Sequence, residues 1–123
     1  MIGYVTLGTN DIEKAAAFYD KIAAELGFGR FMATDSFISW GAAGVGAGLG
    51  LTKPFDGKPM SVGNGVMVAL AADDKAQVNR LHKLALSLGG TCEGPPGPRG
   101  EDGFYAAYFR DLDGNKLKAF VMG

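Results

Sequence analysis

Hydrophobic and polar positions along this chain follow one order of elements twice. In the first half, residues 2–7 alternate as a strand does, and residues 11–27 carry apolar side chains at the three-to-four spacing of one helical face. That apolar stripe consists of Ile12, Ala15, Phe18, Tyr19, Ile22 and Leu26. Gly27 then supplies a left-handed stop for the helix. Residues 28–41 and 44–52 are rich in aromatic or small residues and are separated by glycine and Asp-Ser turns, so they predict further strands.

The second half repeats this order. Residues 66–74 predict a strand that ends in an aspartate cap, and residues 74–90 predict a helix that stops at Gly89. Its apolar stripe consists of Val78, Leu81, Ala85 and Leu88. Aligning Tyr4 with Met67 brings the two strands into register, and the two helix ends then differ by one deletion. An internal repeat of this kind predicts two structurally related modules.

The repeat predicts an α+β fold in which two βαβββ modules form curved mixed sheets around a cleft. We expect a single domain over residues 1–123, built from modules at about 1–53 and 64–123 with a linker at 54–63. Each module alone is too small to bury its own sheet, so the two are expected to pack on each other. Alternation along the strands places Val5, Leu7, Val68 and Leu70 under the helices, and Tyr4, Thr6, Met67 and Ala69 toward the cleft.

Composition and charge narrow the classes of partner. The chain has 123 residues, 47% of them apolar, and a formal charge of −1 from 12 basic and 13 acidic residues that do not cluster by sign. This balance gives no support to nucleic acid or an anionic membrane as a partner and favours a small molecule. The single cysteine cannot form an internal disulfide, and no apolar run approaches the ~20 residues of a membrane span. We therefore expect a reduced, cytoplasmic protein.

Three stretches of the chain resemble the vicinal oxygen chelate superfamily of glyoxalases, bleomycin-resistance proteins and extradiol dioxygenases. They are residues 4–30, 65–99 and 105–120, and the last, which contains "RDLDGNKLKAF", is the most specific. The resemblance implies paired βαβββ modules with a substrate cavity between the sheets, and commonly a homodimer. In metal-using members it also implies a divalent ion held by histidine and glutamate at matching positions of the two modules.

The positions that match the family's metal ligands are Tyr4, Met67 and Lys118. A phenol is an uncommon ligand, a thioether suits soft ions, and a lysine ammonium repels a cation. The only histidine, His82, falls on the second helix at the border of its apolar stripe, and we expect it to be a partly exposed helical residue. We therefore expect no metal cofactor in this protein.

Two glycine-rich segments invite functional interpretations. "GAAGVGAGLG" (residues 41–50) leads to no helix, so it does not fit a phosphate-binding loop. As a strand it places Gly46, Gly48 and Gly50 on one face, which admits a ligand or another chain, or else marks a weak edge strand. "GPPGPRGED" (residues 94–102) predicts a loop, whose Arg99 either closes over an acidic ligand or is a solvated surface residue.

Several other candidates have ordinary structural interpretations. The pairs Asn10-Asp11 and Asp73-Asp74 fit helix caps better than catalytic carboxylates. Cys92 has no histidine partner nearby in the sequence, and we expect a buried small side chain rather than a nucleophile. Trp40 and Phe37 either line the cleft or belong to the core, as aromatic residues of small sheets usually do.

The last hairpin carries the candidate of greatest interest. A three-residue loop with left-handed Gly114 pairs Tyr108 with Lys118, whereas a two-residue loop pairs Phe109 with it, and we prefer the first register. Alternation then places Lys118 and Phe120 on the cleft side. Lys118 either extends its amine to the cleft mouth, or holds an anionic group, or acts as a base or Schiff-base amine.

These observations lead to a hypothesis about function. The leading one is a metal-independent glyoxalase/bleomycin-resistance-like homodimer that binds a small organic molecule in a cleft between the sheets. The expected lining residues are Tyr4, Thr6, Met67, Tyr108, Lys118 and Phe120. The alternative is a glyoxalase-like lyase or isomerase, or a dioxygenase-related enzyme, with a non-standard or metal-dependent site in which Lys118 and Tyr4 are the catalytic candidates. A weaker alternative is an interaction protein whose cleft is filled by its own side chains.

Overall fold

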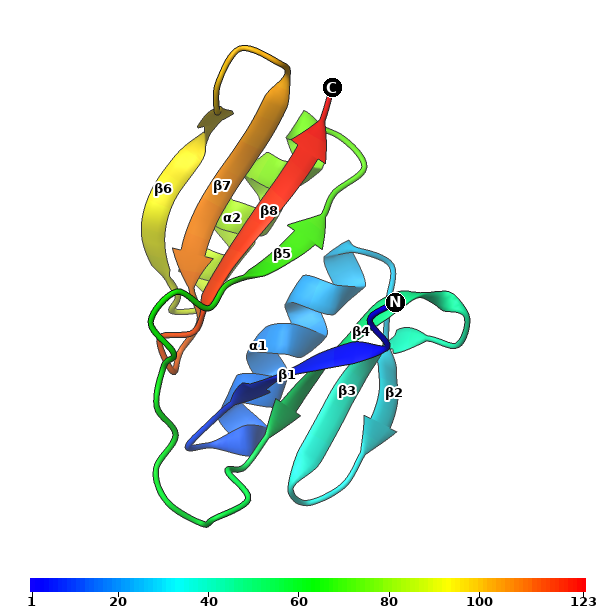
Figure 1. The fold of residues 1–123 in the computed structure, drawn as a ribbon, viewed down its shortest axis with the longest axis vertical. Helices are drawn as coiled ribbons and strands as arrows, with labels where there is room; N and C mark the ends of the chain where they lie inside the picture. The colour runs from blue at the N-terminus through cyan, green and yellow to red at the C-terminus, as the bar shows by residue number, and fades with distance from the viewer. The chain divides into compact units, whose positions relative to one another are not determined.

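The computed structural model describes residues 1–123 and divides the chain into two units, Met1–Val62 and Gly63–Gly123. The elements of unit 1 are β1 (Tyr4–Gly8), α1 (Ile12–Glu25), β2 (Arg30–Ala33), β3 (Phe37–Ala42) and β4 (Val45–Thr52). The strand order is β1-β4-β3-β2, in which β1 is parallel to β4 and the other pairs are antiparallel (Figure 1). Unit 1 is thus one βαβββ module with a mixed sheet.

Unit 2 has the same order of elements. They are β5 (Val68–Ala71), α2 (Lys75–Ser87), β6 (Thr91–Pro98), β7 (Phe104–Arg110) and β8 (Lys116–Met122). The sheet order is β5-β8-β7-β6, with β5 parallel to β8, and it repeats that of unit 1 position for position. The predicted α+β fold of two βαβββ modules with mixed sheets is therefore confirmed.

Short-range signals set the ends of both helices. The N-cap residues are Asp11 and Asp74, whose carboxylates accept hydrogen bonds from the backbone N–H groups of Lys14 and Gln77. These bonds satisfy donors that have no partner within the helix. Gly27 and Gly89, with φ of +86° and +103°, follow the helices in the left-handed region as expected. Neither helix is long and apolar enough to cross a membrane.

Each helix covers one face of its own sheet, and the core of each unit lies between them. In unit 1 the buried residues include Leu7, Phe18, Tyr19, Ile22, Ile38 and Leu51, and in unit 2 they include Val78, Leu81, Ala85, Phe109, Leu117 and Ala119. Side chains at alternate strand positions point to the opposite face, which we call the helix-free face of each sheet. Both candidate sites described below lie on helix-free faces.

The sequence-based expectation of a loop at residues 94–102 is wrong for its first half. Strand β6 runs through Pro95, Pro96 and Pro98 and pairs antiparallel with β7. Proline is tolerated there because β6 is an edge strand, and the register shifts between Cys92 and Gly97 remove positions that would need an N–H donor. Only the residues after Pro98 form the turn into β7.

Candidate functional site

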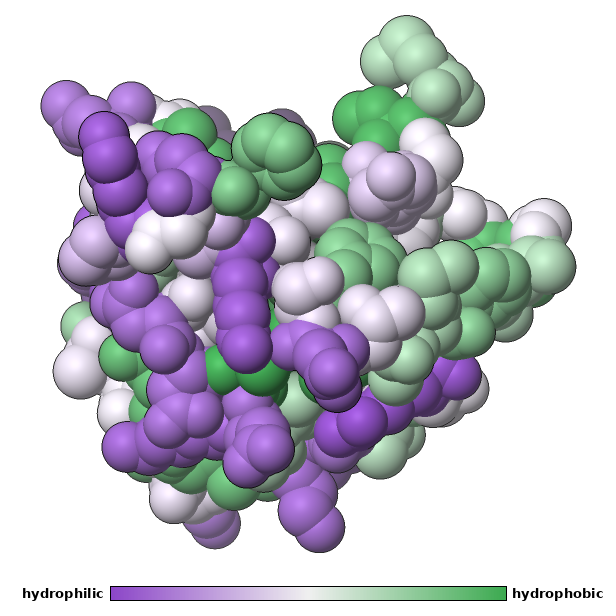
Figure 2. Space-filling view, turned by 90° about the horizontal axis from the view of Figure 1, so that it is seen from below, coloured by the Kyte–Doolittle hydropathy of each residue, from purple (hydrophilic) through white to green (hydrophobic).

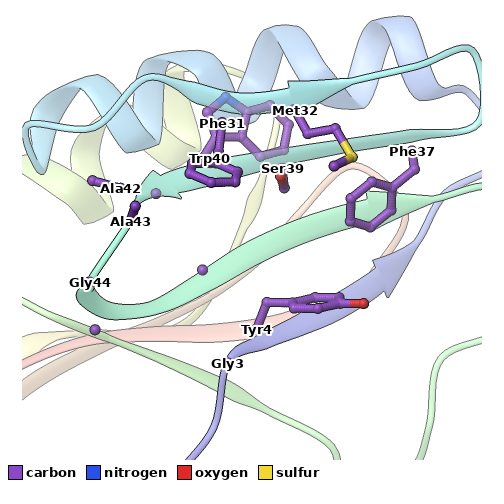
Figure 3. Close-up of a pocket in the computed structure, with 13 residues that line it drawn as sticks. Gly3, Tyr4, Phe31, Met32, Phe37, Ser39, Trp40, Ala42, Ala43 and Gly44 are labelled. Carbon is purple, nitrogen blue, oxygen red and sulfur yellow. The ribbon is translucent and has the colours of Figure 1, made fainter.

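A pocket of about 560 Å³ lies on the helix-free face of the unit 1 sheet (Figure 3). It is lined by Gly3, Tyr4, Phe31, Met32, Phe37, Ser39, Trp40, Gly41, Ala42, Ala43, Gly44, Gly46 and Gly48. No charged side chain is among them. Tyr4, Phe31 and Met32 are exposed by 64%, 60% and 50%. On the surface shown in Figure 2, hydrophobic residues predominate on the right of the view and hydrophilic ones on the left. The pocket therefore suits an uncharged or apolar part of a small molecule.

The glycines of β4 provide the floor of this region. The predicted alternation is confirmed, because Leu51 is fully buried under α1 while a Cβ on Gly50 would meet the Phe37 ring at 2.9 Å. The Phe37 ring thus occupies the space that a side chain at Gly50 would need, and it meets Tyr4 edge to face, with ring centroids 6.1 Å apart. The glycine face is occupied in part by the chain's own aromatic ring, and the remainder forms the pocket.

Trp40 follows Ser39 in β3, so its indole points to the opposite side of the sheet, where it is buried and meets Tyr19 of α1. Its indole N–H donates to Oδ1 of Asp20 at 2.9 Å, and Asp20 also accepts two hydrogen bonds from Arg30, at 2.9 and 3.0 Å. The Arg30 guanidinium, helped by the Trp40 N–H, holds the pKa of Asp20 below its usual value. Asp20 is a residue that the sequence reasoning did not single out, and it joins α1 to β2 and β3.

The helix-free face of unit 2 carries the last hairpin in the preferred register. Tyr108 pairs directly with Lys118, and Gly114 has a φ of +91°, so the three-residue loop is confirmed. Asp111, which is buried, accepts hydrogen bonds from the backbone N–H groups of Asp113 and Asn115, and so fixes the turn. The sequence "DLDGN" thereby determines which side chains of β7 and β8 stand opposite each other.

Lys118 is surrounded by aromatic rings. Its Nζ lies 4.7 Å from the ring centroid of Phe104, 5.6 Å from that of Phe120 and 5.7 Å from that of Tyr108. All four residues are half-buried. A cation held above ring faces is attracted by the ring quadrupoles. Lys118 is therefore positioned by its neighbours on this face, and its catalytic role stays a prediction.

The positions that match the family's metal ligands do not fit a divalent ion. Lys118 places an ammonium group there, Tyr4 contributes a phenol to the unit 1 pocket, and Met67 lies just before β5 with 38% exposure. Moreover, no three histidine, cysteine, aspartate or glutamate side chains come together closely enough to hold a metal ion. The donor chemistry of these residues thus disagrees with the metal site that the family implies.

Two expectations outside these faces were wrong. His82 is buried rather than partly exposed, with 8% exposure, because α2 packs that side against the sheet. Cys92 is exposed rather than buried, and its Sγ lies 3.2 Å from Nε2 of His82. A register shift follows Cys92 in this edge strand, and the histidine comes from another element, which spacing along the chain does not reveal. Burial lowers the pKa of His82.

The structure brings the predicted site residues together in two groups. Tyr4 lines the unit 1 pocket, and Thr6 lies beside Gly50 on the same face. Tyr108, Lys118 and Phe120 meet on unit 2. A cleft shared by both groups stays a prediction.

The sequence reasoning missed several residues of these faces: Phe31, Met32 and Ser39 in unit 1, and Phe104 in unit 2. For Ser39 and Phe104, strand alternation was an available signal. Ser39 follows Phe37 by two residues in β3, and Phe104 precedes Tyr108 by four in β7. Positions two or four apart in a strand share a face.

Comparisons with known proteins agree on the family. The family model described as "Glyoxalase/Bleomycin resistance protein/Dioxygenase superfamily" matches residues 1–118. A search of curated proteins finds no match. Among solved structures, the chain is 38% identical to a glyoxalase/bleomycin resistance protein from Albidiferax ferrireducens T118, with a TM-score of 0.88 over 98% of this chain and 97% of that one.

Two further solved structures share the fold at lower identity. One is a glyoxalase/bleomycin resistance protein/dioxygenase family enzyme from Burkholderia phytofirmans PsJN, with 19% identity and a TM-score of 0.75 over 96% of this chain and 95% of that one. The other is a lactoylglutathione lyase from Agrobacterium tumefaciens, with 22% identity and a TM-score of 0.70 over 98% and 92%. The repeated modules, the terminal hairpin and these matches agree, and the chain belongs to the glyoxalase/bleomycin resistance protein/dioxygenase superfamily, the vicinal oxygen chelate group.

Proposed function

We propose that this protein binds a small organic molecule without the help of a metal, and that the pocket of unit 1 receives an apolar or aromatic part of that ligand. The observation that carries the proposal is the pocket itself, about 560 Å³ in volume, walled by aromatic, methionine and small residues over a glycine floor. Pockets of this size, apolar with a few polar groups, are typical of small-molecule sites. The hydroxyl groups of Tyr4 and Ser39 are the polar groups here.

The absence of a metal from the proposal rests on donor chemistry. Tyr4, Met67 and Lys118 take the positions where metal-using relatives supply ligands, and an ammonium group at one of them opposes a cation. Binding would then depend on shape, ring contacts and hydrogen bonds. A homodimer, as the family suggests, is part of the same proposal.

The chain offers an internal reporter for the test. Trp40 is the only tryptophan and belongs to a strand that borders the pocket, so a change in its fluorescence would report a change in this sheet when the pocket fills. A set of planar organic probes is titrated against the wild type, against Tyr4→Ala, and against Val45→Ala as an exposed apolar control outside the lining. We expect Tyr4→Ala to weaken the best probe about three- to tenfold, since one ring contact is lost, and Val45→Ala to leave it unchanged.

Three results would contradict the proposal. If no probe binds the wild type, or if both variants bind the best probe equally well, the pocket is not the ligand site. The same titration, repeated after dialysis against a chelator, tests whether binding is independent of a metal. Binding that disappears with the chelator and returns with zinc, manganese, nickel or iron would overturn metal independence.

A second candidate function is that of a glyoxalase-like lyase or isomerase. The observation in its favour is Lys118, an amine held among three rings at the position of a family ligand. One relative of the same fold is a lactoylglutathione lyase, so thioester formation from methylglyoxal and glutathione is the first assay to perform. Turnover that falls in Lys118→Met would favour this candidate over the binding protein, and its absence would favour the binding protein.

A further inference from the structure

The helix-free face of unit 2 concentrates positive charge in a chain whose net charge is −1. Three cationic groups surround the Tyr108 ring: the guanidinium carbon of Arg99 lies 5.5 Å from its centroid, Nζ of Lys116 5.6 Å and Nζ of Lys118 5.7 Å. None of the three forms an ion pair. Like charges gathered in this way repel one another, so the face as it stands favours an anion.

One carboxylate beside this face, that of Glu93, is already engaged by Arg110. Glu93 accepts a hydrogen bond from Nε of Arg110 at 2.6 Å, and this contact lowers the pKa of the Glu93 carboxyl. Arg110 also donates to the carbonyl of Gly114. Lys116 also interacts electrostatically with Glu93, whereas Arg99 and Lys118 form no ion pair with a carboxylate.

The three cations differ in their freedom to contact a ligand. Arg99 donates to the backbone carbonyls of Pro95, Gly97 and Pro98 at 2.7 to 3.3 Å, so its guanidinium is held against β6. Gly94 and Gly97 leave room for it, since a Cβ on either would lie 3.2 Å from a guanidinium nitrogen. Lys118 has no hydrogen-bond acceptor within the protein, and its neighbours are rings. Its ammonium N–H groups are therefore the donors best placed to meet a ligand.

We propose that this face binds a small planar organic anion, an aromatic carboxylate or aromatic phosphate, with Lys118 as the residue that selects for negative charge. Lys118 supplies charge-assisted hydrogen bonds, Lys116 and Arg99 add to the positive potential, and the rings of Phe104, Tyr108 and Phe120 contact the planar part of the ligand. The cluster has only three cations and its side chains are half-buried, which suits a small anion rather than a polymer. This inference goes beyond the proposed function, because it concerns unit 2 and does not depend on the unit 1 pocket.

The test compares probes that match in shape and differ in charge. Benzoate is compared with benzamide, and phenyl phosphate with phenol, by isothermal titration calorimetry on the full chain. The variants are Lys118→Met, which keeps the stem and removes the charge, and Lys118→Arg, which keeps the charge. Lys75→Met is the matched control, because Lys75 lies over Tyr105, 5.6 Å from its ring centroid, on the helix side of the same sheet.

We expect at least one anion to bind about tenfold more tightly than its neutral partner. Lys118→Met should abolish that preference, whereas Lys118→Arg and Lys75→Met should retain it. If neither anion is preferred, or if Lys118→Met and Lys75→Met lower the preference equally, the proposal is wrong. A preference for phenyl phosphate alone would identify phosphate as the group recognised, and one for benzoate alone would identify carboxylate.

Thermal unfolding of each variant shows that it is folded, and Trp40 fluorescence in the same titrations reports on unit 1. A charge preference that depends on Lys118 without any change in Trp40 emission would support the unit 2 site while the proposed function fails. A change in Trp40 emission without a charge preference that depends on Lys118 would overturn the unit 2 site and leave the proposed function standing.

Discussion

The two units have the same topology, but their helix-free faces differ in chemistry. In unit 1 this face carries glycines, Phe37 and Tyr4 and forms an uncharged pocket. In unit 2 the corresponding face carries Lys116 and Lys118 beside Tyr108. The helix-facing sides remain apolar in both units, and each includes a leucine with 0% exposure, Leu51 in unit 1 and Leu117 in unit 2. The repeat therefore preserves what each sheet needs to pack against its helix and leaves the other face free to differ.

Glycine serves the same physical purpose on both faces. In unit 1, Gly50 lets the Phe37 ring lie across β4, and in unit 2, Gly94 lets Arg99 and Tyr108 lie across β6. In each case a side chain from elsewhere occupies the space that a Cβ would need. A glycine thus makes room for an aromatic ring on the helix-free face of unit 1 and for a cation on that of unit 2.

The largest expected effect on stability comes from substitutions on the helix-facing sides of the two sheets, which should respond alike. Leu51→Ala and Leu117→Ala remove side chains with 0% exposure from corresponding faces of the two sheets. Each should lower the free energy of unfolding by about 2–5 kcal/mol, through lost burial and the cavity left behind. Thr6→Ala and Lys118→Met, on the helix-free faces, should change it by less than about 1 kcal/mol. Urea denaturation measures all four, and a leucine variant no less stable than Thr6→Ala would contradict the comparison.

The next largest effect on stability concerns two ion pairs, Asp20–Arg30 in unit 1 and Glu93–Arg110 in unit 2. Asp20→Ala should cost about 1–3 kcal/mol, because the buried indole N–H of Trp40 loses its acceptor. The Arg30 contact adds little, since both of its side chains are about two-fifths exposed. Glu93→Ala breaks an exposed pair with Arg110 and should leave stability unchanged within error.

Asp20→Asn separates the two contributions, because an amide oxygen still accepts from Trp40 while the charge is lost. It should recover most of the stability that Asp20→Ala loses and keep the wild-type Trp40 emission. Thermal and urea unfolding give the stabilities. Equal losses in Asp20→Asn and Asp20→Ala would show that charge, and not the Trp40 hydrogen bond, is what stabilises this contact.

Local signals made much of this fold predictable from the sequence. Gly27, Gly89 and Gly114 take left-handed conformations where the pattern placed them, and the hairpin loop fixed the pairing of Tyr108 with Lys118. These features depend on residues close together in the sequence. Strand β6 was missed because three prolines oppose a strand, and only its place at the sheet edge, which depends on distant residues, makes them acceptable.

The candidate site was predictable only in part, for a related reason. Tyr4 and Lys118 were found because alternation and hairpin register assign a face to each strand position. The partners of a side chain on that face come from other strands. The hydrogen bonds of Arg99 to its own strand, and the contact between His82 and Cys92, follow from bulges and helix packing that no spacing along the chain specifies.

The smallest expected effect distinguishes the two helices by their response to acid. Helix α2 carries the only histidine, and burial lowers the pKa of His82 below its ordinary value of 6.5, so the folded state binds its proton less readily than the unfolded chain does. Stability that depends on neutral His82 is therefore fully present above about pH 6.5 and decreases as the pH falls toward the folded pKa. Urea denaturation at about pH 8 and about pH 5.5 should show this loss in the wild type and a smaller one in His82→Gln. An equal loss in both proteins would show instead that carboxylates such as Asp20, whose lowered pKa stabilises the folded state at higher pH, account for the acid response.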